Sequence, residues 1–430
     1  MRVRPFLCVT AALALTVGPA LAQRQLPQWS AAVDGNGYPH VIGAPAQPGQ
    51  GVLANVSQRA VSFTPEGGLR WSLWLCPECA GNALLRPRIL AVDLLADGSA
   101  WLLAAYPARD GDDARYELVL VAADGTVLHR AVMPAWPGLP RSPVLRSTAT
   151  QALALIPAPG GLRWLRSVAG ESAVATQLVE LPGNFDTVTI TNSRLWPNGS
   201  LSVALYTANV AACQFNPPTA NCRPAAFTLL RLNADGSERW RVNAGSGQVF
   251  IGFDDDSSSL IAQNGGTTLQ LRQVGANGVP GAAFAAADGE TLTMTGAAGP
   301  VGGRYLAAAA NEYVLLDRDG RVLARRPFAT AAGPALTNGA YGFVTPAWYS
   351  DAALVSADDL ATLAVFDVDG IDNTDWEAPA NLFWSLLSDG SLYTNARGNG
   401  DTAAPQRWRI SRFAVPGSPA SDLIFAHHFD

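Results

Sequence analysis

Apolar and polar residues alternate along much of the chain, and short glycine-containing turns interrupt the alternation. In the stretch FTLLRLNADGSERWRV, from Phe227 to Val242, the apolar positions Leu230, Leu232, Trp240 and Val242 lie on either side of one turn. Such alternation predicts half-buried strands, and an Asp-Gly turn between two of them predicts a β-hairpin, because glycine takes the positive φ that the turn needs.

The hairpin recurs throughout the chain, and hairpins can be grouped into eight successive pairs. The first turns are predicted near Gly35, Gly98, Ala149, Gly199, Asp256, Gly299, Asp351 and Gly390, and the second near Gly67, Gly125, Gly160, Gly236, Gly278, Gly320, Gly370 and Gly417. Four short antiparallel strands in each unit of roughly 50 residues, with no helical period, indicate an all-β fold, a β-propeller of about eight four-stranded blades. The sequence pattern of the hairpin pairs around Ala149, Asp256, Gly299 and Asp351 is weaker, so a propeller of seven blades is the alternative.

A tryptophan recurs four residues after a turn glycine, at Trp71, Trp164 and Trp240, and His129 holds the same place after Gly125. This position is expected on the outermost strand of a blade, where a flat side chain covers the seam to the next blade. The indole N–H is then free to reach a backbone carbonyl. Tryptophans scattered through a core would not keep a fixed offset from the turn.

The segments VSFTPEGGLRW, ALIPAPGGLRW and LLRLNADGSERW resemble the repeat of the quinoprotein-like, eight-bladed β-propeller superfamily. RLWPNGSLSVALY followed by FTLLRLNADGS is also similar to the hairpin repeats of secreted bacterial propellers of the delta-60 type. The resemblance covers most of the chain after the N-terminal segment with short motifs, and it implies the fold far more than a function.

The N-terminal segment has the features of a secretory signal peptide. Arg2 and Arg4 precede an apolar run, and a small-x-small site ends at Ala22, so residues 1–22 are expected to be removed and residues 23–430 to form a single propeller domain. Cys8 lies within the apolar run, which argues against lipid attachment there, and no other run is long enough to span a bilayer. We therefore expect a secreted or periplasmic protein without a lipid anchor.

Charge restricts the partners. Without Arg2 and Arg4 the chain carries 27 basic against 35 acidic residues, and no dense basic cluster is present to follow a phosphate backbone. Nucleic acid is therefore not an expected partner. We expect a monomer that binds a protein, a peptide or a glycan.

Four cysteines remain after the signal peptide, Cys76 and Cys79 in CPEC, and Cys213 and Cys222 in CQFNPPTANC. An even number in an exported chain predicts disulfides, and of the three pairings we favour the two local ones. The alternatives are a zinc site, for which no histidine lies near either pair, and a redox-active C-x-x-C, whose chemistry needs a helix N-terminus.

The segment FDVDGIDNTDWE contains Asp367, Asp369, Asp372 and Asp375, a density of oxygen ligands that suits calcium. The order departs from that of an EF-hand loop but resembles aspartate-rich calcium loops of extracellular repeats. The favoured interpretation is an ordinary Asp-Gly turn with solvated carboxylates, and calcium is the alternative. No other cofactor is expected.

No motif for catalysis stands out. The chain contains no Gly-x-Ser-x-Gly elbow and no adjacent Cys-Cys pair of the kind beside the quinone in some quinoprotein dehydrogenases. The prediction is therefore a non-catalytic binding or scaffold module. The alternative is a propeller enzyme acting on a sugar or alcohol, because paired carboxylates contributed by different blades leave no local motif.

Strand direction predicts which face binds the partner. The short turns within hairpins fall on one face of the disc, and the longer connections fall on the other: 108–115, 210–224, 396–405 and the CPEC segment. Long loops on a rigid scaffold commonly carry binding, so the loop-rich face is the predicted functional face. Tolerated insertions without a role are the alternative.

Overall fold

The structure is a computed structural model. It describes residues 24–25, 27–35, 40–43, 51–56, 59–77, 87–106, 115–133, 143–183, 185–209, 223–245, 248–254, 256, 258–263, 270–285, 294–301, 304–309, 312–317, 319–327, 332–337, 341–346, 352–356, 358–366, 376–377, 385–387, 391–398 and 406–414. These ranges consist of strands and turns, and they contain no helix that is long and apolar enough to cross a membrane.

The described strands form eight sheets, which we number in chain order. Sheet 1 consists of β3 (His40–Gly43), β4 (Val52–Val56), β5 (Arg59–Phe63) and β6 (Leu69–Trp74). Sheet 2 consists of β7 (Arg88–Leu94), β8 (Ala100–Tyr106), β9 (Arg115–Val121) and β10 (Val127–Val132). Sheet 3 consists of β11 (Val144–Ser147), β12 (Gln151–Ala158), β13 (Gly161–Val168) and β14 (Val174–Glu180). Sheet 4 consists of β15 (Thr187–Leu195), β16 (Leu201–Asn209), β17 (Arg223–Leu232) and β18 (Glu238–Gly245).

The second half of the chain repeats this arrangement. Sheet 5 consists of β19 (Gln248–Phe253), β20 (Ser259–Gln263), β21 (Gln270–Val274) and β22 (Phe284–Ala285). Sheet 6 consists of β23 (Met294–Val301), β24 (Arg304–Ala309), β25 (Glu312–Leu316) and β26 (Val322–Pro327). Sheet 7 consists of β27 (Ala332–Thr337), β28 (Tyr341–Pro346), β29 (Ala352–Ser356) and β30 (Thr362–Phe366), with β1 (Arg24–Gln25) added beside β30. Sheet 8 consists of β31 (Trp376–Glu377), β32 (Ser385–Leu386), β33 (Leu392–Gly398), β34 (Gln406–Phe413) and β2 (Trp29–Gly35).

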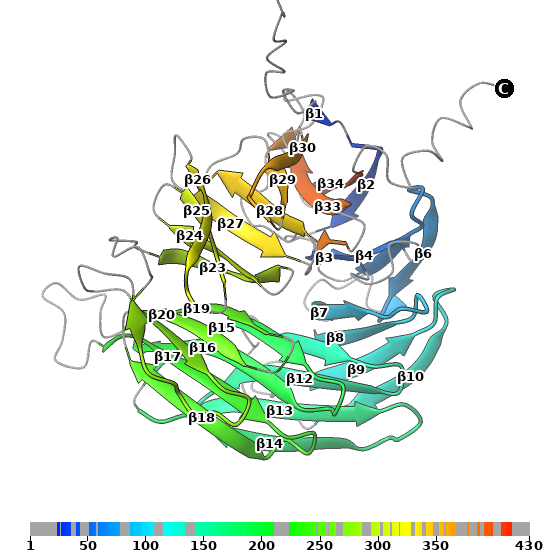
Figure 1. Ribbon diagram of the computed structural model, residues 1–430. Helices are drawn as coiled ribbons and strands as arrows, with labels where there is room; N and C mark the ends of the chain where they lie inside the picture. The colour runs from blue at the N-terminus through cyan, green and yellow to red at the C-terminus, as the bar shows by residue number, and fades with distance from the viewer. Residues whose placement is uncertain are drawn as a thin grey trace, which may run out of the picture.

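The sheets follow one another around a ring in chain order (Figure 1). Within a sheet, paired strands are antiparallel, except that β1 runs parallel to β30 in sheet 7. The first strands of neighbouring sheets contact one another, as β3 does with β7, β7 with β11 and β23 with β27. Short antiparallel strands stacked radially in this way form a β-propeller, so the all-β propeller fold predicted from the alternation is confirmed.

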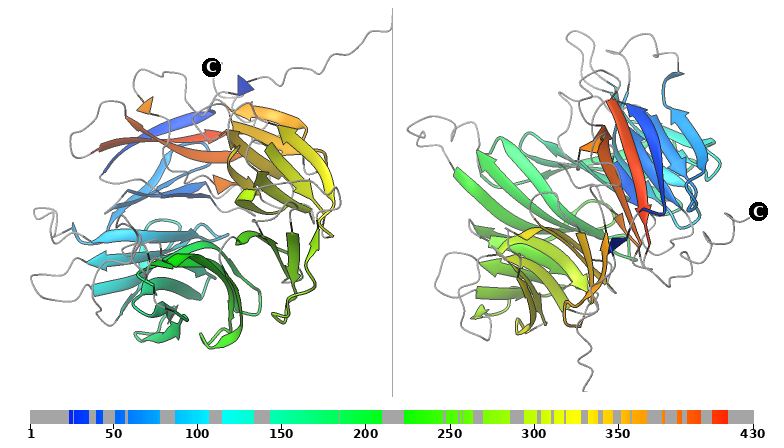
Figure 2. Two further views of the ribbon diagram at one scale, coloured as in Figure 1. Left: turned by 90° about the vertical axis from the view of Figure 1, so that its left-hand side faces the viewer. Right: turned by 90° about the horizontal axis from the view of Figure 1, so that it is seen from above.

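The two ends of the chain close the ring. The N-terminal strand β2 pairs antiparallel with β34 as the outermost strand of sheet 8, from Trp29 opposite Arg412 to Gly35 opposite Gln406. Figure 2 shows blue β2 beside the red strand β34. The prediction of a first turn near Gly35 is therefore wrong, because this stretch belongs to the last sheet and sheet 1 begins at His40.

Most of the predicted turns that fall within the described residues join the expected strands, including those at Gly67, Gly98, Gly125, Gly199, Gly236, Gly278 and Gly320. Gly160 instead joins the second and third strands of sheet 3, whose last turn contains Gly170. Both glycines have positive φ, as turns of either kind require. A turn glycine in the sequence therefore does not indicate which two strands of the sheet it joins. Gly299 lies within β23. Asp351, Gly370, Gly390 and Gly417 lie outside the described residues.

The turn at Gly236 shows why Asp-Gly suits these positions. Gly236 has a φ of 87°, and its N–H donates to the Asn233 carbonyl oxygen over 3.0 Å. The carboxylate of Asp235 accepts hydrogen bonds from the Ser237 hydroxyl at 2.6 Å and the Ser237 N–H at 2.9 Å. These bonds satisfy turn groups that have no partner in the strands, and they lower the pKa of Asp235.

Tryptophans close the seams between sheets as predicted. The indole Nε1 of Trp71 on β6 donates to the Ala123 carbonyl oxygen of sheet 2 at 3.0 Å, and that of Trp240 on β18 donates to Ala276 of sheet 5 at 3.0 Å. Trp29 on β2 makes the same kind of bond, to the Pro65 carbonyl oxygen of sheet 1 at 2.7 Å. The tryptophan pattern does not include Trp29, because β2 pairs with the distant strand β34 and not with a strand next to it in the sequence.

Trp164 and His129 also lie at seams between neighbouring sheets, but their contacts differ from those of Trp71 and Trp240. Trp164 lies on β13, so the prediction that it belongs to an outermost strand is wrong, yet its ring covers the turn glycine Gly236 of the next sheet. His129 on β10 bonds the Ser167 hydroxyl at 3.1 Å and accepts from the Gly170 N–H at 3.4 Å, both in sheet 3. The role of His129 is thus structural.

Candidate functional site

Strand pairing assigns the connections to two faces. Because neighbouring strands are antiparallel, turns between the first and second and between the third and fourth strands of a sheet lie on one side, which we call the turn face. Connections between the second and third strands and between sheets lie on the other side, the loop face. On the loop face, β8 ends at Tyr106 and β9 begins at Arg115 in sheet 2, and β16 ends at Asn209 and β17 begins at Arg223 in sheet 4.

The predicted long loops leave the sheets on the loop face, although most of their residues lie outside the described ranges. Segment 108–115 joins β8 to β9, segment 210–224 joins β16 to β17, and segment 396–405 joins β33 to β34. Each therefore connects the second and third strands of a sheet, as predicted.

Cys76 follows β6 on the loop face and is buried. It is disulfide-bonded, whereas its partner is not among the described residues. Cys79, Cys213 and Cys222 all lie outside those residues, so the two local pairings stay predictions.

The aspartates predicted as the alternative calcium site lie outside the described residues. Asp367, Asp369, Asp372 and Asp375 fall between the end of β30 and the start of β31, outside the described residues. Among the residues that the structure describes, no three His, Cys, Asp or Glu side chains are grouped closely enough to hold a metal ion.

A charged cluster lies at the loop-face end of sheet 2. Its centre is Glu117, whose side chain is only 6% exposed, and its other members are Tyr106, Arg115 and Arg130. One Glu117 oxygen accepts from the Tyr106 hydroxyl at 3.0 Å and from Arg130 Nη1 at 3.4 Å, and the other lies 3.4 Å from Arg115 Nη2. We call these four residues the Glu117 cluster.

The Glu117 cluster carries a net positive charge near solvent. A buried carboxylate is costly without a counter-ion, and here two guanidinium groups share one carboxylate. The side chains of Arg115 and Arg130 are 53% and 39% exposed. The cluster therefore offers N–H donors that a carboxylate or another anion can accept in pairs.

Further contacts hold the cluster in position. The Arg115 guanidinium stacks 4.2 Å above the Tyr106 ring, and Arg130 Nη2 donates to the Leu75 carbonyl oxygen at 3.1 Å. Burial, together with the nearby Glu117 charge, raises the pKa of Tyr106, so its hydroxyl stays a hydrogen-bond donor. Through Leu75 the cluster is joined to the base of the CPEC segment.

Sequence reasoning did not find this cluster. Tyr106 and Arg115 are separated by a loop, and Arg130 lies on the next strand, so only the pairing of β8, β9 and β10 brings them together. The available signal was Glu117, a charged residue in the otherwise apolar run YELVLV.

Aspartates on or just after inner strands form hydrogen bonds between neighbouring sheets. Asp93 on β7 accepts from the Ser147 N–H at 2.6 Å and the Ser147 hydroxyl at 2.8 Å, which joins sheets 2 and 3. The Tyr305 hydroxyl donates to buried Asp254 at 3.2 Å, which joins sheets 6 and 5. These carboxylates therefore contribute to ring assembly.

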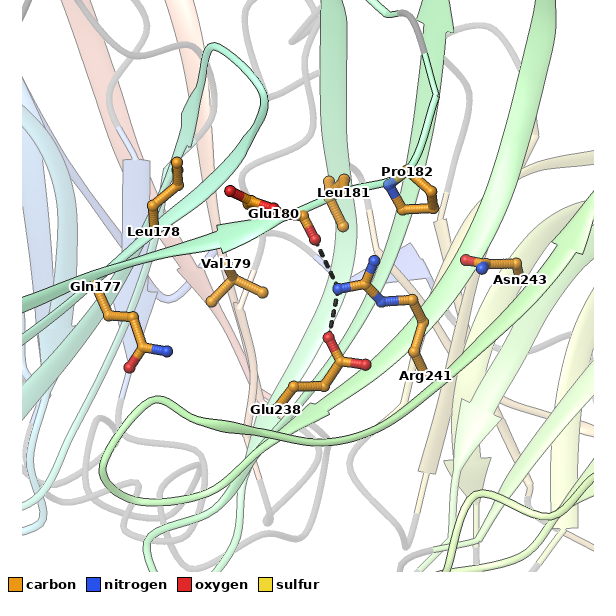
Figure 3. Close-up of a pocket in the computed structure, with 9 residues that line it drawn as sticks. All are labelled: Gln177, Leu178, Val179, Glu180, Leu181, Pro182, Glu238, Arg241 and Asn243. Carbon is orange, nitrogen blue, oxygen red and sulfur yellow. Dashed lines mark hydrogen bonds and ion pairs between the residues drawn. The ribbon is translucent and has the colours of Figure 1, made fainter.

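A groove of about 640 Å³ lies on the outer rim between sheets 3 and 4. It is lined by residues 177–182, in β14 and just after it, and by Glu238, Arg241 and Asn243 of β18 (Figure 3). Arg241 crosses the groove, where its Nη2 donates to the Glu180 carbonyl oxygen at 2.7 Å and pairs with the Glu238 carboxylate. The groove was not predicted.

No protein-family model matches the chain, and no curated protein is found as a relative. Solved structures with a similar fold include BamB from Moraxella catarrhalis, at 10% identity and a TM-score of 0.43 over 89% of this chain and 100% of that one. Apo AztD from Citrobacter koseri matches at 11% identity and 0.43, over 85% and 95%. Virginiamycin B lyase from Staphylococcus aureus matches at 12% identity and 0.39, over 74% and 96%. At these scores the likenesses carry no weight for function, and the fold rests on the strand pairing.

Proposed function

We propose that the protein is a secreted or periplasmic, non-catalytic binding module that holds its partner on the loop face. The observation that carries this proposal is the Glu117 cluster, in which a buried carboxylate positions two half-exposed arginines at the base of the predicted loops. The signal-peptide pattern of residues 1–22 supports export.

The cluster favours an acidic group on the partner. Arg115 is fixed by an ion pair and by stacking on Tyr106, so little side-chain entropy is lost when it binds an anion. Peptide aspartate and glutamate, and the carboxylates of acidic glycans, present the planar oxygen pair that a guanidinium recognises. Acidic peptides and acidic oligosaccharides are therefore the ligand classes to test first.

The test is binding of the purified protein to an array of acidic oligosaccharides and acidic peptides. Arg115→Gln should reduce the signal about tenfold, the loss expected for one charge-assisted pair, while Arg115→Lys should retain part of it. Asp124→Asn, on the turn face, serves as the matched control and should bind as the wild type does. Equal binding by wild type and Arg115→Gln would contradict the proposal, and turnover of a sugar or alcohol without array binding would favour the propeller enzyme.

A further inference from the structure

The outer edge of β14 has a definite hydrogen-bonding pattern and is not paired with any strand in the part of the chain that the structure describes. β14 pairs with β13 along one side, and no other described strand pairs with it. The N–H of Leu181 donates to Gly160 at 3.0 Å, and groups that point toward β13 alternate along a strand. The N–H and C=O groups of Thr176, Leu178 and Glu180 therefore point away from β13.

A second contact confirms this direction. Arg241 Nη2 reaches the Glu180 carbonyl oxygen at 2.7 Å from the opposite wall of the groove. That bond is only compatible with a Glu180 carbonyl on the outer edge. The groups of Thr176 and Leu178 continue the same edge beyond the arginine.

The structure contains an example of strand addition at the equivalent place. In sheet 7 the segment β1 pairs with the outer edge of β30, with Arg24 opposite Val365 and Gln25 opposite Phe366, and so becomes a fifth strand. β30 is the outermost strand of its sheet, as β14 is of sheet 3. An outer edge of this propeller can therefore accept an added strand.

The side chains of β14 leave its edge accessible. From Val174 to Val179 the strand carries no charge, and Ala175, Thr176, Gln177 and Leu178 are exposed. Edge strands that must stay unpaired are commonly protected by charges or proline. Val179 is buried in the seam with sheet 4 and fixes the strand in place.

The charge of the groove selects among partners. Its lining carries two carboxylates, those of Glu180 and Glu238, against the single guanidinium of Arg241, which already pairs with Glu238. The whole chain has a net charge of −6, so a second copy would approach with the same sign. A basic segment is the complementary occupant.

We infer that β14 and the groove beside it bind an extended, basic segment of a partner protein, which adds to sheet 3 as a fifth strand. Main-chain hydrogen bonds to Thr176 and Leu178 give the affinity, and a lysine or arginine opposite Glu180 or Glu238 gives the preference for basic segments. The site lies on the outer rim between sheets 3 and 4 and is separate from the Glu117 cluster of sheet 2.

The test is fluorescence anisotropy with a labelled peptide that alternates valine with threonine and lysine. Leu178→Pro removes an outward N–H without removing a bond to β13, and it should weaken binding about tenfold, whereas Leu178→Ala keeps the N–H and should bind nearly as the wild type does. Replacing the peptide lysines with glutamates should also abolish binding.

A second measurement covers the case in which Leu178→Pro fails to fold. N-methylation of alternate peptide bonds removes the peptide's edge donors and should weaken binding to the wild-type protein by a similar factor. Binding that survives both proline and N-methylation, or no binding of the lysine peptide at all, would overturn the inference. A dimer in sedimentation that Leu178→Pro dissociates would overturn the basic partner and identify a second copy as the occupant.

Discussion

The indole of Trp240 lies directly over Gly278 of the next sheet, so that a Cβ added to this glycine would lie 2.4 Å from Trp240 Cγ. Gly278 also has a φ of 80°. Gly278→Ala should therefore lower the free energy of unfolding through backbone strain and through the clash, by about 2–4 kcal/mol in denaturant titration. Gly170→Ala is the matched control, because its φ is 88° and nothing lies within 4 Å of the added Cβ. An equal loss in the two variants would show that the indole contact contributes nothing.

Removing the seam tryptophan should also destabilise the protein. Trp240 is half-buried, so Trp240→Ala should cost less than a fully buried aromatic residue, about 2 kcal/mol. Trp240→Phe keeps most of the aromatic contact but loses the hydrogen bond to Ala276, so its stability should lie between that of the wild type and that of Trp240→Ala. Denaturant titration measures the loss. Array binding by the folded fraction should be unchanged, and reduced binding without reduced stability would instead make Trp240 a ligand contact.

The sequence was sufficient to predict the propeller because its repeat is local. Alternation and the turn glycines identify strands that pair with their immediate neighbours, as the hairpin of β17 and β18 around Gly236 does. The ring closure is a pairing between Trp29 and Arg412 at opposite ends of the chain, and alternation within β2 does not indicate which strand is its partner. This is why Gly35 was assigned to the first hairpin.

The candidate sites depend on contacts between strands that the local pattern does not specify. Glu117 could be recognised as a charge within an apolar run, but its pairing with Arg130 follows from the register of β9 and β10. The groove beside β14 requires Arg241 of one sheet to reach Glu180 of another. By contrast, the faces of the long connections follow from strand order alone, and that part of the prediction agrees with the pairing.

The Cys213–Cys222 segment should contribute to binding and not to folding. It connects β16 and β17 on the loop face, so replacing Gln214 to Asn221 by a short Gly-Ser link changes a surface connection. The melting temperature should stay within about 2 °C of the wild type, because the core of sheet 4 is untouched. Array binding to acidic ligands should weaken, and unchanged binding would remove this segment from the functional face.

Calcium distinguishes the two interpretations of the aspartate-rich segment. If Asp367, Asp369, Asp372 and Asp375 bind calcium, the ion stabilises the folded protein by mass action, and the melting temperature should rise with calcium and fall back with chelator. Asp369→Asn combined with Asp372→Asn should abolish the rise. The same melting temperature with calcium and with chelator would leave an ordinary Asp-Gly turn as the interpretation.

Asp93 should make stability depend on pH in the direction opposite to that of the turn aspartates. Burial raises the pKa of Asp93 above the ordinary 3.8, against the opposing effects of Arg146 and Ser147. The folded state therefore favours the neutral acid. Its contribution to stability is fully present below about pH 3.8 and is lost as the pH rises through the raised pKa. Asp235, whose pKa is lowered by Ser237, contributes stability that is lost as the pH falls.

The variant Asp93→Asn separates these opposing effects. Asparagine keeps an oxygen that can accept from Ser147 but does not ionise. The difference in unfolding free energy between variant and wild type should be constant in strong acid, and should then move in favour of the variant as Asp93 ionises in the wild type. Denaturant titration across the acidic range measures this difference. A pH-independent difference would mean that Asp93 titrates alike in the folded and unfolded chains, and that its place between sheets 2 and 3 imposes no electrostatic cost.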